Sequence, residues 1–130
     1  MKIDVEESPF GDGGAMLIAV EGELDLASCE RLKPAADQAV FGRRPLVLDL
    51  SQCSFLDSSA LRLILQIYKG LADGEPPPTP MAIVIGDSET RRLFSLTAID
   101  KTIPMFRARE EARAWLEGET AGRGEAASAS

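Results

Sequence analysis

The most informative absence in this 130-residue sequence is histidine, which does not occur at all. Without an imidazole the chain cannot form a Ser-His-Asp triad or a Cys-His pair, and it lacks the commonest side-chain ligand of transition metals. Cysteine is also scarce: Cys29 and Cys53 are far apart and have no CxxC spacing, which favours two reduced thiols over a redox pair or a zinc site. We therefore expect no metal, no cofactor and no enzymatic activity.

Positive charge is the second shortage, with 14 Lys and Arg against 21 Asp and Glu and a net charge of -7. This balance opposes binding to nucleic acid or to anionic lipid and favours a basic or neutral protein partner. The first residues, 1–7, lack the apolar core of a signal peptide, and no apolar run approaches the roughly 18 residues of a membrane span. We expect a cytoplasmic protein with no direct contact to membrane or nucleic acid.

What the sequence does have is an alternation of short apolar runs and helix-spaced segments, which predicts one α/β domain with a mixed sheet and helices packed on it. Ile3–Glu7 and Ala15–Glu21 indicate an opening hairpin, because turn-forming residues separate them. The nearly continuous apolar run Pro45–Leu50 is typical of a central strand that is covered on both faces and parallel to a neighbour. The remaining expected strands are Met81–Ile85 and Ile103–Phe106.

Four helices are expected between and after these strands. The first ends near Gly42 and contains Pro34, which either kinks it or lies in its first turn. The second begins at Ser58 and is deeply packed, with one apolar face made by Leu61, Ile64, Leu65, Tyr68 and Leu71, and with Leu63 and Ile67 beside that face. A third helix, capped by Asp87 or Ser88, reaches Leu96, and a fourth spans Arg109–Leu116.

Two segments are expected to be irregular. The prolines of residues 74–80 favour an extended, stiff connector before the strand at Met81. Residues 118–130 are mainly Gly, Ala, Ser and Glu and lack large apolar side chains, so we expect a domain of residues 1–117 followed by a disordered tail.

One edge of the expected sheet should collect polar side chains. Parallel strands joined by right-handed crossovers place every loop from a strand into the next helix along the same edge. Three polar segments occupy such loops, so we expect them to lie at that edge: Asp25, Asp57–Ser59, and Asp87 with Ser88.

The run Asp57-Ser58-Ser59 supports two compatible interpretations. Short polar residues before a packed helix are typical N-caps, worth about 1 kcal/mol. A hydroxyl at a helix N-terminus is also a suitable carrier of phosphate, because unpaired amides and a partial positive charge lie there. The terminus stabilises an anion by about 0.3 to 1 kcal/mol, so a phosphate would change binding without unfolding the domain.

Four segments resemble the STAS domain, the family named for sulphate transporters and anti-sigma factor antagonists. They are Gly22-Glu23-Leu24-Asp25, Leu48-Asp49-Leu50-Ser51, Phe55-Leu56-Asp57-Ser58-Ser59-Ala60-Leu61, and Arg92-Leu93-Phe94 followed by Leu96. The resemblance covers about Ala15 to Leu116 and is greatest to the free-standing antagonists. It implies a STAS-like fold and a phosphoprotein that regulates transcription by partner switching.

The resemblance implies that Ser58 is phosphorylated by an anti-sigma factor that is also an ATP-dependent serine kinase. Unphosphorylated protein would bind that kinase and release the sigma factor, and a phosphatase would reset the switch. The expected partner-binding residues are Asp25, Asp57, Ser58, Ser59 and Leu61. Asp25 is equally compatible with a cap of the first helix, and we assign Ser59 the role of helix cap.

One departure and two alternatives accompany this interpretation. The family motif usually has glycine where this chain has Ala60, which suits a helix and changes nothing in the chemistry of Ser58. An enzyme with Ser58 as nucleophile and Asp57, Asp25 or Asp49 as its partner would lack a histidine or nearby lysine as base. A STAS domain that serves as a fixed docking subunit of a transporter or signalling scaffold, with no phosphorylation cycle, is the other alternative.

Overall fold

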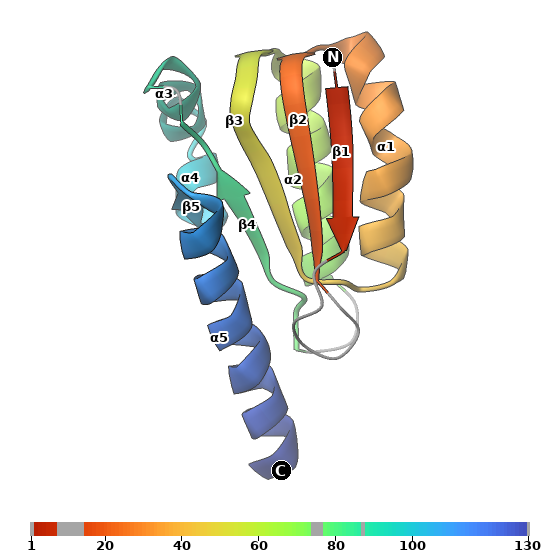
Figure 1. Cartoon of the computed structure of the whole chain (residues 1–130), viewed down its shortest axis with the longest axis vertical. Helices are drawn as coiled ribbons and strands as arrows, with labels where there is room; N and C mark the ends of the chain where they lie inside the picture. The colour runs from red at the N-terminus through yellow and green to blue at the C-terminus, as the bar shows by residue number, and fades with distance from the viewer. Residues whose placement is uncertain (1, 8–14, 74–76, 87, 130) are drawn as a thin grey trace.

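The computed structural model describes residues 2–7, 15–73, 77–86 and 88–129, and the side chains of these residues other than 7, 88 and 120–129. Within these ranges a five-stranded sheet has the order β1-β2-β3-β4-β5. Figure 1 shows the helices lying on both sides of this sheet. The predicted α/β class with a mixed sheet is confirmed.

The strands follow the predicted pattern with different ends. β1 (Lys2–Glu7) pairs antiparallel with β2 (Met16–Leu24), which confirms the opening hairpin. β3 (Leu46–Leu56) lies between β2 and β4 (Met81–Val84) and is parallel to both, as its apolar run indicated. The last strand, β5 (Met105–Phe106), pairs parallel with β4 and is shorter than expected.

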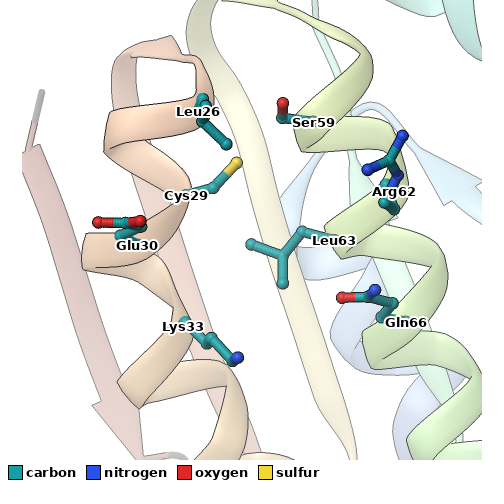
Figure 2. A pocket seen from close by; sticks show the side chains of 8 residues that line it. All are labelled: Leu26, Cys29, Glu30, Lys33, Ser59, Arg62, Leu63 and Gln66. Carbon is teal, nitrogen blue, oxygen red and sulfur yellow. The ribbon is translucent and has the colours of Figure 1, made fainter.

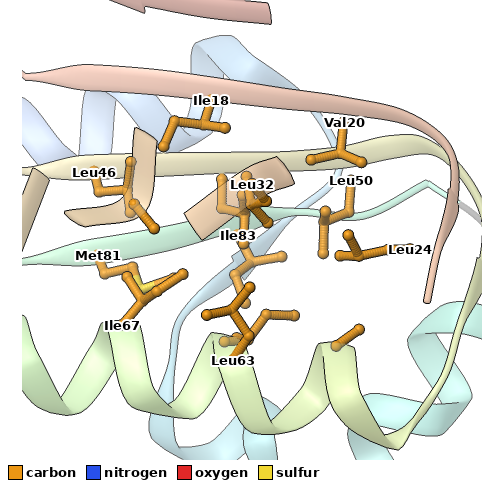
Figure 3. Close-up of a cluster of buried hydrophobic side chains, with 14 of the residues drawn as sticks. Ile18, Val20, Leu24, Leu32, Leu46, Leu50, Leu63, Ile67, Met81 and Ile83 are labelled. Carbon is orange, nitrogen blue, oxygen red and sulfur yellow. The ribbon is translucent and has the colours of Figure 1, made fainter. Parts of the chain in front are cut away.

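Side chains of the central strands alternate between two apolar layers. Ile18, Leu48 and Leu50 belong to the larger layer, which faces helices α1 (Leu26–Phe41) and α2 (Ser58–Ala72). Leu17 and Val47 belong to the smaller layer, on the side of α5 (Arg109–Ala129). Figure 3 shows part of the larger layer, with Ile67 and Leu63 of α2 directed at the sheet. Burial on both faces explains why β3 lacks the alternation of a half-exposed strand.

Both α1 and α2 differ in detail from expectation. α1 begins at Leu26, so Pro34 lies inside the helix and the alternative that placed it in the first turn is wrong. On α2 the buried positions are Ala60, Leu63, Ile64, Ile67 and Leu71. Leu65, which we expected on the buried face, is 41% exposed. The packed stripe is therefore centred on Ile64 and Ile67 rather than on Leu61 and Leu65.

The C-terminal half adds helices at the β4–β5 edge. α3 (Ser88–Leu96) agrees with the predicted third helix, whereas the short α4 (Ile99–Thr102) was not expected. Asp87, one of its two predicted caps, lies outside the described residues.

The last helix, α5, runs to Ala129, so it does not end at Leu116 as the sequence indicated. Its buried side chains, Ala112 and Leu116, lie in its first turns. The division into a domain of residues 1–117 and a tail stays a prediction. Among the described residues, no helix is both long enough and apolar enough to cross a membrane.

Candidate functional site

The N-terminal ends of α1 and α2 meet at one edge of the sheet. The Asp57 N–H donates a hydrogen bond of 3.3 Å to the Leu24 carbonyl, which joins the end of β3 to the end of β2. Asp25 and Asp57 each follow directly on these strand ends. The two carboxylates also act on the same thiol: burial raises the pKa of Cys29, and the negative charges of Asp57 and Asp25 raise it further.

Asp25 is the N-cap of α1. Its carboxylate accepts the Ser28 N–H and the Ser28 hydroxyl, each at 2.9 Å. These two bonds, led by the backbone one, hold the pKa of Asp25 below its ordinary value. The capping role that the sequence left open is therefore present, and a contact of Asp25 with a partner stays a prediction.

Asp57 performs the same task for α2, because its carboxylate accepts the Ala60 N–H at 3.1 Å. The expectation that Ser59 caps this helix is wrong: Ser59 is already inside the first turn. Ser58 is the first helical residue and is exposed. Its hydroxyl has no hydrogen-bond partner among the described residues, so Ser58 is both accessible and dispensable for the cap.

A groove separates the N-terminal halves of α1 and α2 beside these caps (Figure 2). Its walls come from successive turns of the two helices: Leu26, Cys29, Glu30, Lys33, Ser59, Arg62, Leu63 and Gln66. Farther along, the two helices approach so closely that a Cβ on Gly70 would lie 2.9 Å from a methyl group of Val40. The open part of this interface is thus the part nearest to Ser58.

Two further hollows lie near the start of α2, and Ser58 lines the first of them. One lies along α2 and is lined by Ser58, Leu61, Arg62, Leu65, Gln66 and Lys69. The other lies between the end of β3 and α3 and is lined by Ser54, Phe55, Leu56, Glu89, Thr90 and Leu93. The first turn of α3 therefore reaches the same edge, as predicted from the topology.

Exposed apolar side chains surround this edge. Leu26 is 66% exposed, Phe55 is 49% exposed, and half-buried Leu61 lies next to Leu65 in the hollow along α2. The predicted set included Leu61 but not Leu26, Phe55 or Arg62. Leu26 and Phe55 could have been found as large apolar residues beside the two aspartates. Water-exposed apolar groups gathered around polar ones are typical of a protein-binding surface.

The described residues show neither a catalytic pair at Ser58 nor a metal cluster. No group of three or more Cys, Asp or Glu side chains is placed to hold a metal ion in the part of the chain that the structure describes. Asp25 and Asp57, the nearest carboxylates to Ser58 in sequence and topology, accept backbone amides in their caps. Both carboxylates are therefore engaged as helix caps.

Known proteins resemble this chain in sequence and in fold. Residues 10–112 match the family model described as the STAS domain. The chain is 27% identical over 106 residues to the anti-sigma-F factor antagonist RsfB of Mycobacterium tuberculosis, covering 81% of this chain and 84% of the relative. It also superimposes on an anti-sigma factor antagonist from Mycobacterium paratuberculosis with a TM-score of 0.73 and 29% identity, over 88% and 94% of the two chains.

A more distant structure shares the fold. The Bacillus cell fate determinant SpoIIAA in its phosphorylated form matches with a TM-score of 0.62 and 19% identity, covering 87% of this chain and 99% of that one.

Proposed function

This chain belongs to the STAS domain family, and we propose that it is an anti-sigma factor antagonist switched by phosphorylation of Ser58. Unphosphorylated protein binds an anti-sigma factor that is also a serine kinase, and this releases the sigma factor. Phosphorylation ends the binding, and a phosphatase restores it. The observation that carries the proposal is the exposed Ser58 hydroxyl, which has no described hydrogen-bond partner and stands at a helix start that Asp57 already caps.

Because Asp57 and not Ser58 caps α2, phosphorylation of Ser58 should cost the fold little stability. A kinase must reach the hydroxyl, and an exposed first-turn serine meets that need. Phosphate on Ser58 leaves the Asp57 cap in place, and the helix N-terminus favours the added anion by about 0.3 to 1 kcal/mol. The modification therefore acts on the surface rather than on folding.

The apolar surroundings explain how the added charge can end binding. Ser58 lines the same hollow as Leu65 and follows Phe55 by three residues, so a partner that covers these apolar side chains also excludes water from Ser58. A phosphate carries a charge of about -1.5 to -2 at neutral pH, and its desolvation opposes the complex. A hundredfold loss of affinity requires about 2.7 kcal/mol, which desolvation and repulsion of a dianion can supply.

The relatives support the partner class. RsfB is named as an antagonist of an anti-sigma-F factor, and SpoIIAA has been solved in a phosphorylated form. The fold that this chain shares with SpoIIAA thus accommodates a phosphate.

The proposal is tested by incubating the protein with the kinase-type anti-sigma factor encoded nearest to its gene, in the presence of ATP. Mass spectrometry of the peptides should place one phosphate on Ser58. The Ser58→Ala variant is the matched control and should stay unmodified, even though Ser59 is intact. A native chain that remains unmodified at Ser58 would contradict the switch and favour the fixed docking subunit.

A further inference from the structure

Arg62 lies one helical turn after Ser58 and shares a hollow with it. Both residues line the hollow along α2, and Arg62 also lines the groove between α1 and α2. Figure 2 shows the Arg62 side chain extended along α2 toward the end that carries Ser59. Residues four apart on a helix have their Cβ atoms about 5 to 6 Å from each other, so a long side chain at 62 reaches position 58.

Arg62 is an exposed cation with no hydrogen bond or ion pair to any described residue. Several other arginines have such partners: Arg43 donates to the carbonyls of Leu71 and Asp73, Arg109 pairs with Asp49, and Arg113 pairs with Glu6. The guanidinium of Arg62 is therefore available to a new anion at the start of α2.

We propose that Arg62 binds the phosphate when Ser58 is phosphorylated, so that the two form an ion pair within α2. This inference rests on the proposed function of Ser58. An anion four residues before a cation is the favourable order on a helix, because it also matches the helix dipole. A guanidinium can donate two parallel hydrogen bonds to phosphate oxygens, which an ammonium cannot do.

Several carboxylates lie near this pair and disfavour a phosphate dianion, and Arg62 would offset their charge. Asp57 precedes Ser58, Asp25 lies at the same edge, and Glu30 and Glu89 line the neighbouring hollows. These carboxylates oppose the second ionisation of a phosphate. Lys33 stands across the groove on α1, and Lys69 lies at the far end of the hollow. On α2, Arg62 is the cation that lies within one turn of Ser58.

The pair gives phosphorylation a second effect on the docking surface. The surface gains a phosphate and at the same time loses Arg62 as a free cation. A partner carboxylate that meets Arg62 in the unphosphorylated complex would then face the phosphate instead.

The test uses full-length protein with phosphoserine placed at position 58 during translation, so no kinase is needed. The second pKa of the phosphate is measured by a ³¹P NMR pH titration. In Arg62→Gln this pKa should rise by about 0.3 of a unit relative to the protein with Arg62, as expected for loss of one pair on a helix surface. Arg62→Lys should give a smaller rise.

Lys69→Gln is the matched control, since it removes the same charge from the same helix. Position 69 lies about 16 Å from position 58 along the helix axis. Its phosphate should titrate as in the parent protein. An unchanged pKa in Arg62→Gln, or equal shifts in both variants, would overturn the inference. Because phosphate is supplied directly, that failure is separate from a failure of the kinase to modify Ser58.

Discussion

At the scale of single residues, Asp25 and Asp57 show how one side chain can serve both the fold and the surface. Each carboxylate caps its helix, and each stands at the edge that we assign to the partner. The sequence placed both aspartates at this edge, but it led us to assign the cap of α2 to Ser59, whereas the cap is Asp57. All three are good caps, and only the backbone path at the end of β3 selects Asp57.

The two roles of Asp25 can be separated by Asp25→Ser. Serine caps a helix about as well as aspartate, so the free energy of unfolding in urea should stay within about 0.5 kcal/mol of the parent. If the carboxylate contacts the partner, affinity for the anti-sigma factor should fall in the same variant. Asp25→Ala, which lacks any cap, should lose about 1 kcal/mol of stability. Unchanged affinity in Asp25→Ser would show that Asp25 is a cap alone.

Asp49 is a buried carboxylate with a structural task. Burial on its own would raise the pKa of Asp49, but hydrogen bonds from Ser51 and Arg109 outweigh burial and lower it. The Ser51 N–H donates at 2.9 Å, and Arg109 forms an ion pair that anchors the start of α5 to β3. Asp49 thereby holds the second helical layer on the sheet.

Because the pKa of Asp49 is lower in the folded chain, its ionised form stabilises the fold above the unfolded value of about 4, and this contribution is lost as pH falls further. Asp49→Asn should reduce the free energy of unfolding by about 1 to 2 kcal/mol at pH 7, since Arg109 is half-exposed. The difference from the parent should vanish as pH falls below about 4.

Glu6→Gln serves as the control for Asp49, because the Glu6–Arg113 pair of 3.4 Å is exposed and should contribute under about 1 kcal/mol. Urea unfolding at several pH values measures both variants. A loss in Asp49→Asn that is the same at pH 3 and pH 7 would contradict the assigned role.

At the scale of elements, the sequence predicted the order and type of nearly every strand and helix, because the apolar periods of the central strands and of α2 are clear. It failed where local geometry overrides pattern. Leu65 fits the apolar period of α2 but is exposed, since the buried stripe is centred on Ile64 and Ile67. α4 was missed because it starts after Ala98, which has a left-handed backbone (φ 62°). Glycine commonly indicates such a conformation in a sequence, whereas alanine does not.

Pro34 offers a test of how α1 is held. It is exposed in the helix interior, where a proline cannot donate to the carbonyl of Glu30. Pro34→Ala should therefore raise the free energy of unfolding by about 1 to 2 kcal/mol. This is less than the difference of about 3 kcal/mol between alanine and proline inside a helix, because alanine also gives the unfolded chain more conformational freedom. Lys33→Ala, at the neighbouring exposed position, should change it by less than about 0.5 kcal/mol. Urea titrations measure both, and a destabilised Pro34→Ala would contradict the expected gain.

At the scale of the whole molecule, the Asp49 ion pair and the candidate docking edge lie in different places on the sheet. α5 and the ion pair of Asp49 lie on one face, while α1 and α2 bring their caps and grooves to one edge. Ser58 is outside both apolar layers, so a phosphate there leaves the core untouched. The net charge of -7 suits a partner with a basic or neutral surface. A phosphate on Ser58 would add negative charge at the edge where we propose that this partner binds.

The most direct measurement of the central claim is isothermal titration calorimetry of the kinase-type anti-sigma factor with three forms of this protein: the parent, Ser58→Ala, and the chain carrying phosphoserine at position 58. The account predicts that the parent and Ser58→Ala bind with similar affinity. The phosphorylated form should bind about a hundredfold more weakly, a loss of about 2.7 kcal/mol. Equal affinity of the parent and the phosphorylated form would contradict the switch.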